Sequence, residues 1–296
     1  MKQGIYPEME EKDYRKLPAL NYSSLADFNE SPDHCLMKKA GKSYFEEGTA
    51  FELLIEDRAK GTNKFAKRFF LADAPGAMPK ELAGWIENKE DLKTKIEYKL
   101  DGDRKKKSKH KWIDECLKNP GMMPMGTDQM KMLGKMVDNF LLMKPLEDIG
   151  VEETLEEILP IAQFQVPIIW YTGKMRKKAL LDCMVETDTA IYVFDIKTAA
   201  NEDKFRKTLS KRYWVQEVHY SSGIGRLFSG KDVIWRFLVS PKDEPWVAFP
   251  AITDKTSIDM AWSKYADLCE SYQEWIEDGR PKKGWKELQT VKVWFD

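Results

Sequence analysis

Three charged side chains lie inside two stretches that the sequence predicts to be neighbouring strands. The stretches 179–185 and 190–196 are rich in apolar, β-branched and aromatic residues, and a short polar segment joins them. This pattern is typical of a β-hairpin. Asp182 lies in the first strand, and Asp195 and Lys197 close the second. Charges placed in strands this apolar need partners or a metal ion.

The spacing of these residues indicates which chemistry they could support. Side chains alternate along a strand, so Asp195 and Lys197 point to the same face. Counting back through the turn predicts that Asp182 lies opposite Val193, one diagonal step from Asp195. Diagonal neighbours lie about 7–8 Å apart at Cα. Two carboxylates at that range can share a divalent cation, with a lysine beside them.

The composition is that of a globular protein with almost no net charge. The chain has 296 residues, of which 33% are charged and 42% are hydrophobic, and its formal net charge is −1. This length is sufficient for one large α/β domain with a substantial core. Affinity for a polyanion would have to come from local basic patches, as in a protein with a basic groove and an acidic back.

The cysteines and the N-terminal residues bear on cofactors and location. Cys35, Cys116, Cys183 and Cys269 are 67 to 86 residues apart, so the sequence contains neither a close metal-binding pair nor a disulfide-dense pattern. We therefore expect reduced thiols, a cytoplasmic location and no iron–sulfur cluster. The sequence has no run of about 18 apolar residues and no apolar leader, so we expect neither a membrane span nor a signal peptide.

A helix is predicted on each side of the hairpin in the sequence. The first begins near Gly48 and carries Glu52 among apolar neighbours. Glu52 lies either on the polar stripe of that helix or in a site, and spacing alone leaves both interpretations open. The second helix follows the hairpin and places Gln216 and Tyr220 at i and i+4, on one face.

Further strands and a long helix surround these elements. Strands are predicted over 161–173, 233–240 and 246–252, and a helix over 256–279. Pro167 should place the first of these strands at a sheet edge or a bulge. The alternation of strands and helices predicts an α/β (α+β) fold, with a central mixed β-sheet flanked by helices.

Residues 60–120 are the least regular part of the chain. Their basic run, 104–111, could contact phosphates, and Trp112 directly after it could stack on a base, although such a run is more often a solvated helix face. The methionine spacing from Thr127 onward indicates a core helix. We expect a single domain over 1–296, with 60–125 as a helical or loop insertion.

The order of the charged and polar residues resembles the PD-(D/E)xK nuclease superfamily. Within it, the chain is most similar to the RecB-like branch and to the nuclease domain of RecE (exonuclease VIII) of phages and prophages. The matching positions are the helix residue Glu52, the strand residue Asp182, the pair Asp195-x-Lys197 and the helix pair Gln216-x-x-x-Tyr220.

Several segments carry the closer resemblance, which covers roughly 20–60 and 150–296. The segments 20–25, 48–51 and 291–294 resemble the opening motif, the approach to the first catalytic position and the closing segment of that family. Phe205 matches the aromatic residue that follows its Asp-x-Lys motif. One departure is Glu52, because the family usually carries histidine there, although glutamate is a competent ligand for a hard cation.

The resemblance implies a restriction-endonuclease-like core and a Mg²⁺-dependent DNA exonuclease, with Mn²⁺ as a substitute metal. It implies that Asp182, Asp195 and the Ile196 backbone carbonyl hold the metal, with Glu52 completing the coordination directly or through water. Lys197 would orient or deprotonate the attacking water and stabilise the transition state.

The resemblance also assigns supporting residues. Gln216 and Tyr220 would hold the catalytic layer together or touch DNA. Arg176 and Lys178, in the basic turn before the hairpin, are further candidates for DNA contact or support of the site.

The partners implied by the resemblance are linear double-stranded DNA and a RecT-like single-strand annealing protein. The expected activity is 5′→3′ digestion that leaves 3′ single strands for phage-type recombination in a bacterial host cell. A ring-shaped homo-oligomer and no membrane association are also implied.

Other interpretations remain open at the level of sequence. One is a catalytically impaired DNA-binding or assembly protein of the same fold, which the substitution at Glu52 favours and the intact Asp182, Asp195 and Lys197 oppose. Another is a RecB-like nuclease of different polarity. A third, a RecB-type nuclease with an iron–sulfur cluster, is opposed by the scattered cysteines.

Overall fold

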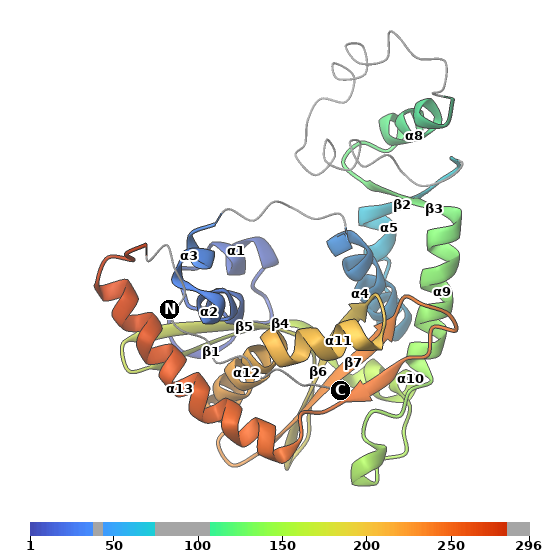
Figure 1. Cartoon of the computed structure of the whole chain (residues 1–296). Helices are drawn as coiled ribbons and strands as arrows, with labels where there is room; N and C mark the ends of the chain where they lie inside the picture. Colours follow the sequence, from blue (N-terminus) through green and yellow to red (C-terminus); the bar gives the residue numbers. More distant parts are fainter. Residues whose placement is uncertain (38–43, 75–106, 283–296) are drawn as a thin grey trace, which may run out of the picture.

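The centre of the fold is a six-stranded mixed sheet with the strand order β1-β4-β5-β6-β7-β8 (Figure 1). The structure is a computed structural model that describes residues 1–37, 44–74 and 107–282. β6 and β7 run parallel, and the other neighbouring strands run antiparallel. The strands are β1 (Gly4–Ile5), β4 (Gln163–Thr172), β5 (Met175–Glu186), β6 (Ala190–Ala199), β7 (Asp232–Pro241) and β8 (Phe249–Ala251).

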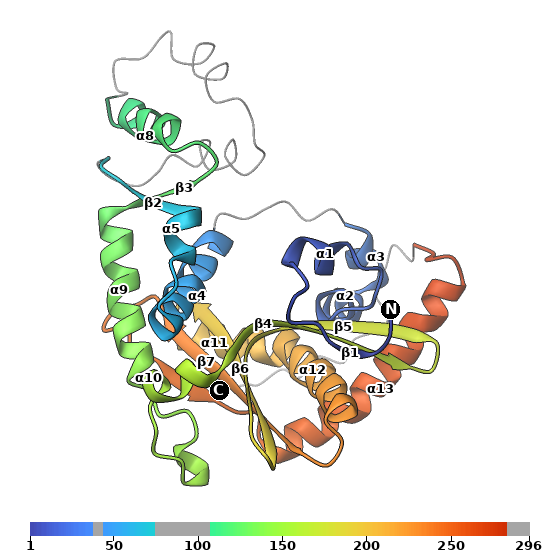
Figure 2. The ribbon, with the colours of Figure 1, turned by 180° about the vertical axis from the view of Figure 1, so that it is seen from behind.

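Helices cover both faces of this sheet, which confirms the predicted central mixed sheet flanked by helices (Figures 1 and 2). On the N-terminal side are α1 (Glu11–Lys16), α2 (Tyr22–Glu30), α3 (Pro32–Leu36), α4 (Tyr44–Lys60) and α5 (Lys64–Arg68). The middle of the chain forms α8 (Lys107–Lys118), α9 (Thr127–Leu141), α10 (Leu155–Ile158) and the 3₁₀ turns Glu147–Ile149 and Leu159–Ile161. The C-terminal part forms α11 (Glu202–Thr208), the π-helix Leu209–Tyr213, α12 (Trp214–Leu227) and α13 (Lys255–Glu277).

Two hydrophobic cores lie on opposite faces of the sheet. Along β6, Ile191 and Val193 pack in the core beneath α11 and α12, whereas Phe194 and Ile196 pack in the core beneath α4 and α9. This is the period-two alternation of a strand that is buried on both faces. Asp195 continues the Ile191 and Val193 row, so its side chain lies on the side of α12.

Most predicted elements near the site are present. The hairpin is confirmed as β5 and β6, and the helix predicted over 256–279 is α13. α4 begins at Tyr44 rather than near Gly48. The strand predicted over 246–252 is restricted to β8, and Trp246, at its predicted start, adopts a positive φ of 58° that is incompatible with extended structure. β1 pairs with β4 at Ile168 and Ile169, and the Tyr6 N–H donates to the Pro167 carbonyl at 2.9 Å, so Pro167 lies where the cover of β4 by the short edge strand β1 ends.

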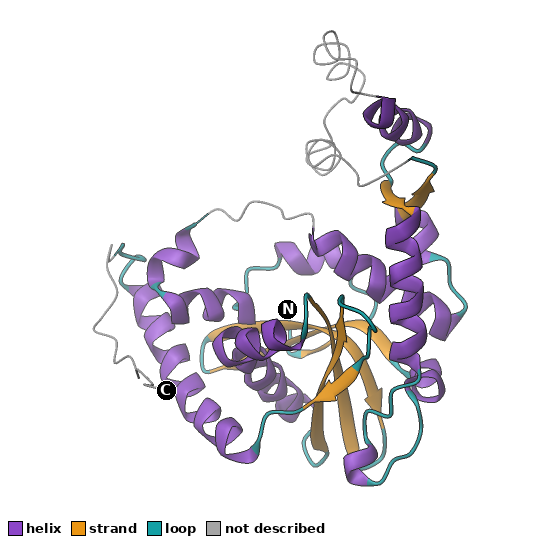
Figure 3. Ribbon diagram, turned by 45° about the vertical axis from the view of Figure 1, so that its right-hand side comes forward, coloured by secondary structure: helices purple, strands orange, loops and turns teal. Residues whose placement is uncertain are grey.

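The described part of 60–125 forms a small unit at the end of α9, away from the six-stranded sheet (Figures 1 and 3). It contains α5, α8 and a parallel pair of short strands, β2 (Phe69–Ala72) and β3 (Met123–Gly126). Trp112 is buried in the core of this unit, so the expectation that it stacks on a base is wrong. Lys111 forms an ion pair with Asp73 at 3.0 Å, and residues 104–106 of the basic run lie outside the described residues.

Candidate active site at a fork in the sheet

β5 and β6 separate in the middle of the sheet. They are paired only where Cys183 to Glu186 face Phe194 to Ile191. Beyond Cys183, β5 stays with β4, and beyond Phe194, β6 stays with β7 as far as Ala199. A fork therefore opens at the next residue of each strand, which is Asp182 on one branch and Asp195 on the other.

The register of the hairpin corrects the sequence-based expectation. Met184, rather than Asp182, lies opposite Val193. The prediction was wrong because Glu186 still belongs to β5, and Ala190 closes the turn by accepting the Thr187 N–H at 2.9 Å. The observed register, continued by one residue, places Asp182 level with Asp195. The two aspartates are therefore direct rather than diagonal neighbours.

Hydrogen bonds and ion pairs join the two branches of the fork. Asp182 Oδ2 accepts the backbone N–H of Ile196 at 3.0 Å, which replaces a hydrogen bond of the interrupted ladder. The Lys197 ammonium forms an ion pair with Asp195 Oδ2 and lies 3.9 Å from Asp182 Oδ2. Gln216 Nε2, from α12, donates to Asp195 Oδ1. The predicted Asp182, Asp195, Lys197 and Gln216 thus come together in one cluster.

The charges of this cluster strongly perturb one another. Burial raises the pKa of Asp195 to about 7; the negative charge of Asp182 adds to the rise, and Lys197 opposes it. Burial also raises the pKa of Asp182. For Lys197, burial alone would lower the pKa, but Asp195 and Asp182 together raise it above its ordinary value. The site therefore contains a firmly protonated lysine between two carboxylates that resist ionising together.

Glu52 belongs to the same electrostatic cluster. It lies one residue after the buried Phe51 on α4 and is partly buried. Burial and the charge of Asp182 raise the pKa of Glu52 well above its ordinary value. Its Oε2 lies 3.5 Å from the side-chain amide of Gln165, at the limit of a hydrogen bond. Of the two interpretations that the sequence left open, the structure favours the one in which Glu52 points into the site.

Gln165 was not identified from the sequence. It occupies the β4 position level with Asp182 and has a positive φ of 51°, so the β4–β5 pairing is interrupted between Phe164 and Val166. A left-handed conformation at a residue other than glycine costs roughly 1–2 kcal/mol. Strain of this kind is concentrated at functional sites. No pattern in the sequence marks this position.

Aromatic side chains surround the cluster. The Tyr213 ring centroid lies 5.3 Å from Lys197 Nζ, which is a cation–π contact. The Tyr22 ring packs edge-on against Tyr220 with centroids 5.6 Å apart. Burial raises the pKa of Tyr22 to about 12, opposed by Lys197 and reinforced by Asp195. Tyr220 therefore packs beside the cluster through Tyr22, its supporting role stays a prediction, and Tyr22 and Tyr213 are additional neighbours.

The edge of β5 that the fork exposes is covered by the segment before α2. The Leu20 N–H donates to the Arg176 carbonyl at 2.9 Å, and the Leu20 carbonyl accepts the Lys178 N–H at 2.8 Å. α2 begins immediately afterwards, with Asn21 as its N-cap. This contact brings Tyr22 to the fork, which explains the location of the segment 20–25 that the resemblance singled out.

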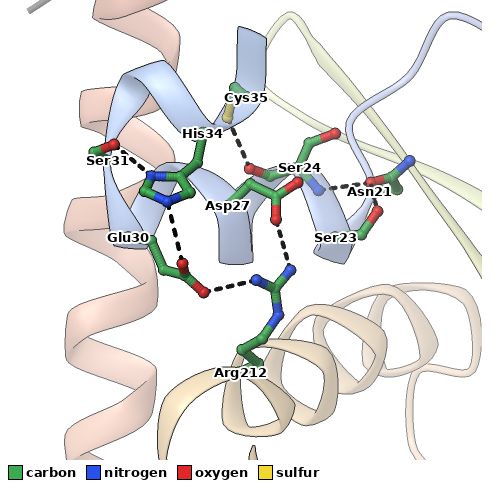
Figure 4. A network of polar contacts seen from close by, with 9 residues as sticks. All are labelled: Asn21, Ser23, Ser24, Asp27, Glu30, Ser31, His34, Cys35 and Arg212. Carbon is green, nitrogen blue, oxygen red and sulfur yellow. Dashed lines mark hydrogen bonds and ion pairs between the residues drawn. The ribbon is translucent and has the colours of Figure 1, made fainter. Parts of the chain in front are cut away.

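A polar network then fixes α2 to the π-helix that precedes α12 (Figure 4). Arg212 donates to Asp27 at 2.6 Å and to Glu30 at 2.7 Å. Figure 4 shows that Glu30 also faces His34, with Nε2 of the imidazole 3.6 Å from the carboxylate. These contacts therefore hold α2, which carries Tyr22, against the π-helix, which carries Tyr213.

The two basic candidates from the turn before the hairpin, Arg176 and Lys178, make their contacts away from the carboxylate cluster. Lys178 is buried, and its ammonium donates to the carbonyls of Tyr14 and Leu17 at 2.8 and 2.9 Å. It thus satisfies the C-terminal end of α1 and is not placed to contact DNA. Arg176 donates from Nε to the Tyr171 hydroxyl at 2.9 Å. Lys178 supports the architecture of the α1 lobe rather than the chemistry.

The fork offers oxygen donors of the kind that a divalent cation binds. Asp195 Oδ2 is buried, and apart from its ion pair with Lys197 it has no hydrogen-bond partner among the described residues. The side-chain carbonyl oxygen of Gln216 is also buried and accepts no hydrogen bond from the described residues. Within the described ranges, no three His, Cys, Asp or Glu side chains gather closely enough to hold a metal ion. Mg²⁺ commonly takes one or two protein carboxylates and retains waters, so the aspartate pair fits it.

Comparison with known proteins adds little to this geometry. No protein family model matches the chain, and no curated protein matches it. Among solved structures, the crystal structure of a "Putative exonuclease" from Eubacterium rectale is similar with a TM-score of 0.37 and 11% sequence identity, covering 87% of this chain and 97% of that chain. A likeness at this level does not decide function.

Among the described residues, each helix is too short or too polar to span a membrane.

Proposed function

We propose that this chain is a metal-dependent nuclease that hydrolyses phosphodiester bonds in DNA at the fork between β5 and β6. The observation that carries the proposal is the convergence of Asp182, Asp195 and Lys197 where the two strands separate. Glu52 on α4 and Gln216 on α12 approach this cluster from opposite faces of the sheet. Clustered groups with perturbed pKa values are characteristic of catalytic sites.

Mg²⁺ is the cofactor that this donor set fits best, with Mn²⁺ as a substitute. Asp182 and Asp195 would hold it, together with the Ile196 backbone carbonyl, and Glu52 would assist directly or through water. When bound, the ion would acidify a water molecule and offset the charge of the phosphate. Two carboxylates with raised pKa values favour such a cation, because its charge relieves their repulsion.

The protein groups have separable tasks in this proposal. Lys197 stabilises negative charge that develops at phosphorus, because its raised pKa keeps it protonated at neutral pH and leaves it a poor base. Gln216 orients Asp195 by donating to its Oδ1. The Tyr213 ring and Asp195 hold the Lys197 ammonium in place. Tyr220 and Tyr22 close the side of the fork next to α2.

The finer proposal is an exonuclease of the RecE type that digests linear double-stranded DNA in the 5′→3′ direction. Its product would be a 3′ single strand for a RecT-like annealing protein in phage-type recombination, and the enzyme would work as a ring-shaped homo-oligomer in the bacterial cytoplasm. The order of motifs along the chain supports this assignment, whereas segment 291–294, part of the resemblance, lies outside the described residues.

The test of the finer proposal is digestion of 5′-labelled linear, 3′-labelled linear and covalently closed circular duplexes in the presence of Mg²⁺. Early release of the 5′ label with the circle left intact is the expected result. Release of the 3′ label first would establish the opposite polarity, and cleavage of the circle would reject an exonuclease. Binding without any digestion would favour the catalytically impaired DNA-binding protein.

A further inference from the structure

A basic helical segment lies directly beside the fork. α11 begins with only two residues between it and the end of β6, and it continues through the π-helix Leu209–Tyr213 into α12. At the far end of this segment, the Tyr213 ring lies 5.3 Å from Lys197 Nζ. The segment is therefore connected to the catalytic strand at both of its ends.

Its buried side and its exposed side are clearly separated. Phe205 is buried, with ring centroids 5.9 Å from Phe237 and 6.0 Å from Phe249. At about 100° per residue, three exposed lysines fall within roughly 60° of one another on the side away from Phe205. They are Lys204, Lys207 and Lys211.

These three lysines outnumber the one carboxylate on their side of the helix, Asp203, whereas the arginines beside them are paired with carboxylates. Arg206 is paired with Glu202, and Arg212 with Asp27 and Glu30 (Figure 4). No ion pair of Lys204, Lys207 or Lys211 occurs among the described residues. In a chain with a formal net charge of −1, such a face is a local excess of positive charge.

The face is also held in a fixed position. Asn201 caps the start of α11 by accepting the Lys204 N–H at 2.9 Å. At the other end, the ion pairs of Arg212 tie the π-helix to α2. A fixed row of charges loses little entropy when a polyanion binds, so this arrangement is suited to recognising a regular backbone.

We propose that Lys204, Lys207 and Lys211 form a phosphate-binding face that holds the DNA backbone where it approaches the fork. This inference rests on the proposed function, which supplies a polyanionic substrate. From Lys204 to Lys211 the helix rises by roughly 10 Å at 1.5 Å per residue. One strand of a duplex carries a phosphate about every 3.4 Å along its axis. The row of lysines therefore spans about three phosphate intervals along a single strand.

The test compares two triple variants of the full chain. Lys204→Gln, Lys207→Gln and Lys211→Gln are combined in one protein. Lys2→Gln, Lys131→Gln and Lys174→Gln are combined in the control, since those lysines are exposed and lie on separate parts of the chain. Binding of a fluorescein-labelled 30-base-pair duplex is measured by anisotropy in EDTA across a series of NaCl concentrations. EDTA prevents metal-dependent cleavage, so the readout does not depend on catalysis.

Each lost phosphate contact should reduce the slope of log K against log salt by about 0.9. The first variant should therefore show a slope lower by about 2.7 and the control a change of less than about 1. Equal changes in the two variants, or no binding by the wild-type chain, would overturn the proposal. If the slopes differ as expected but Mg²⁺ supports no cleavage, the proposed function fails while the phosphate-binding face stands.

A second measurement avoids substitutions altogether. Surface lysines of the wild-type protein are acetylated with and without the duplex and quantified by mass spectrometry. DNA should protect Lys204, Lys207 and Lys211 several-fold more than Lys131 and Lys174. Protection that is the same at all five positions would contradict the assignment.

Discussion

Asp182 on β5 and Asp195 on β6 occupy level positions one residue beyond the last paired residues of their strands, and Asp182 Oδ2 accepts the N–H of Ile196 at 3.0 Å. The side chain of one aspartate thus completes the backbone ladder that the fork interrupts. The other aspartate is fully buried, between Lys197 and Gln216. The proposed metal-dependent nuclease site depends on this pairing of two carboxylates at a break in the sheet.

The metal proposal can be tested without measuring activity. Asp195 has a pKa of about 7 in the folded chain, against an ordinary value near 4, so its contribution to stability is complete at low pH and is lost as pH rises through 7. A cation that binds the ionised pair should offset this loss. We expect 10 mM MgCl₂ to raise the Tm over that in EDTA by more at pH 8 than at pH 5.

The control for this measurement is Asp195→Asn, which should lose the Mg²⁺-dependent rise in Tm at pH 8. Burial also raises the pKa of Glu217 to about 7 and lowers that of His219 to about 3. Their effects cancel when Tm values with and without Mg²⁺ are compared at one pH. An equal rise at both pH values, or a rise retained by Asp195→Asn, would contradict a cation at the aspartate pair.

Lys197 is predicted to act through its charge. Lys197→Met should reduce kcat on duplex DNA by about 10²–10³-fold, as is typical when one group that stabilises a transition state is removed. Lys197→Arg should retain more activity than Lys197→Met, because it keeps a cation beside Asp195. Kinetics at saturating Mg²⁺ provide the measurement. Equal, complete losses in both variants, with Tm unchanged, would instead indicate that Lys197 must give up a proton.

Gln165 is predicted to adopt a strained backbone conformation in which its side-chain amide holds Glu52 in position. Glycine adopts a positive φ without strain, whereas alanine does not. The free energy of unfolding of Gln165→Gly should therefore be about 1 kcal/mol higher than that of Gln165→Ala. Both variants lose the amide that lies 3.5 Å from Glu52 and should lose activity to a similar extent. Urea denaturation and duplex digestion measure the two effects. An alanine variant as stable as the glycine variant would argue against strain at this position.

Gly223 is predicted to be required for the packing of α12 on the sheet. A Cβ at this position would lie 2.7 Å from the Trp170 ring, closer than packing allows, so Gly223→Ala should destabilise the fold by about 1–3 kcal/mol. Gly225→Ala is the matched control on the same helix. Nothing lies within 4 Å of a Cβ there, and alanine should stabilise the helix by up to about 1 kcal/mol. Thermal unfolding compares them, and equal Tm values would refute the packing argument.

The sequence predicted the elements that carry the cluster, because strands and helices are encoded by local patterns. The hairpin, the helix of Gln216 and the sheet between helices were all expected and are present. The relative position of Asp182 and Asp195 was predicted wrongly, because Glu186 pairs with Ile191 and the Thr187 N–H donates to Ala190, which shortens the turn and shifts the register by two residues. That error placed the two carboxylates on a diagonal instead of level with each other.

Residues that depend on tertiary contacts could not be predicted in the same way. Lys178 was expected to contact or support a DNA site, but carbonyls of α1, more than 160 residues earlier, surround its ammonium. Tyr22 reaches the fork only because Leu20 covers the free edge of β5. The strain at Gln165 likewise appears only once β4 and β5 are paired. Each depends on a long-range contact that no local pattern encodes.

The most direct test of the central claim is digestion of linear duplex DNA by the wild-type chain and by Asp195→Asn, each with Mg²⁺ and with EDTA. Asp267→Asn, an exposed aspartate on α13, is the matched control. We expect Mg²⁺-dependent digestion by the wild type and by Asp267→Asn, and none by Asp195→Asn, although all three proteins should bind the duplex in EDTA. Digestion by Asp195→Asn at the wild-type rate would contradict an active site at the fork.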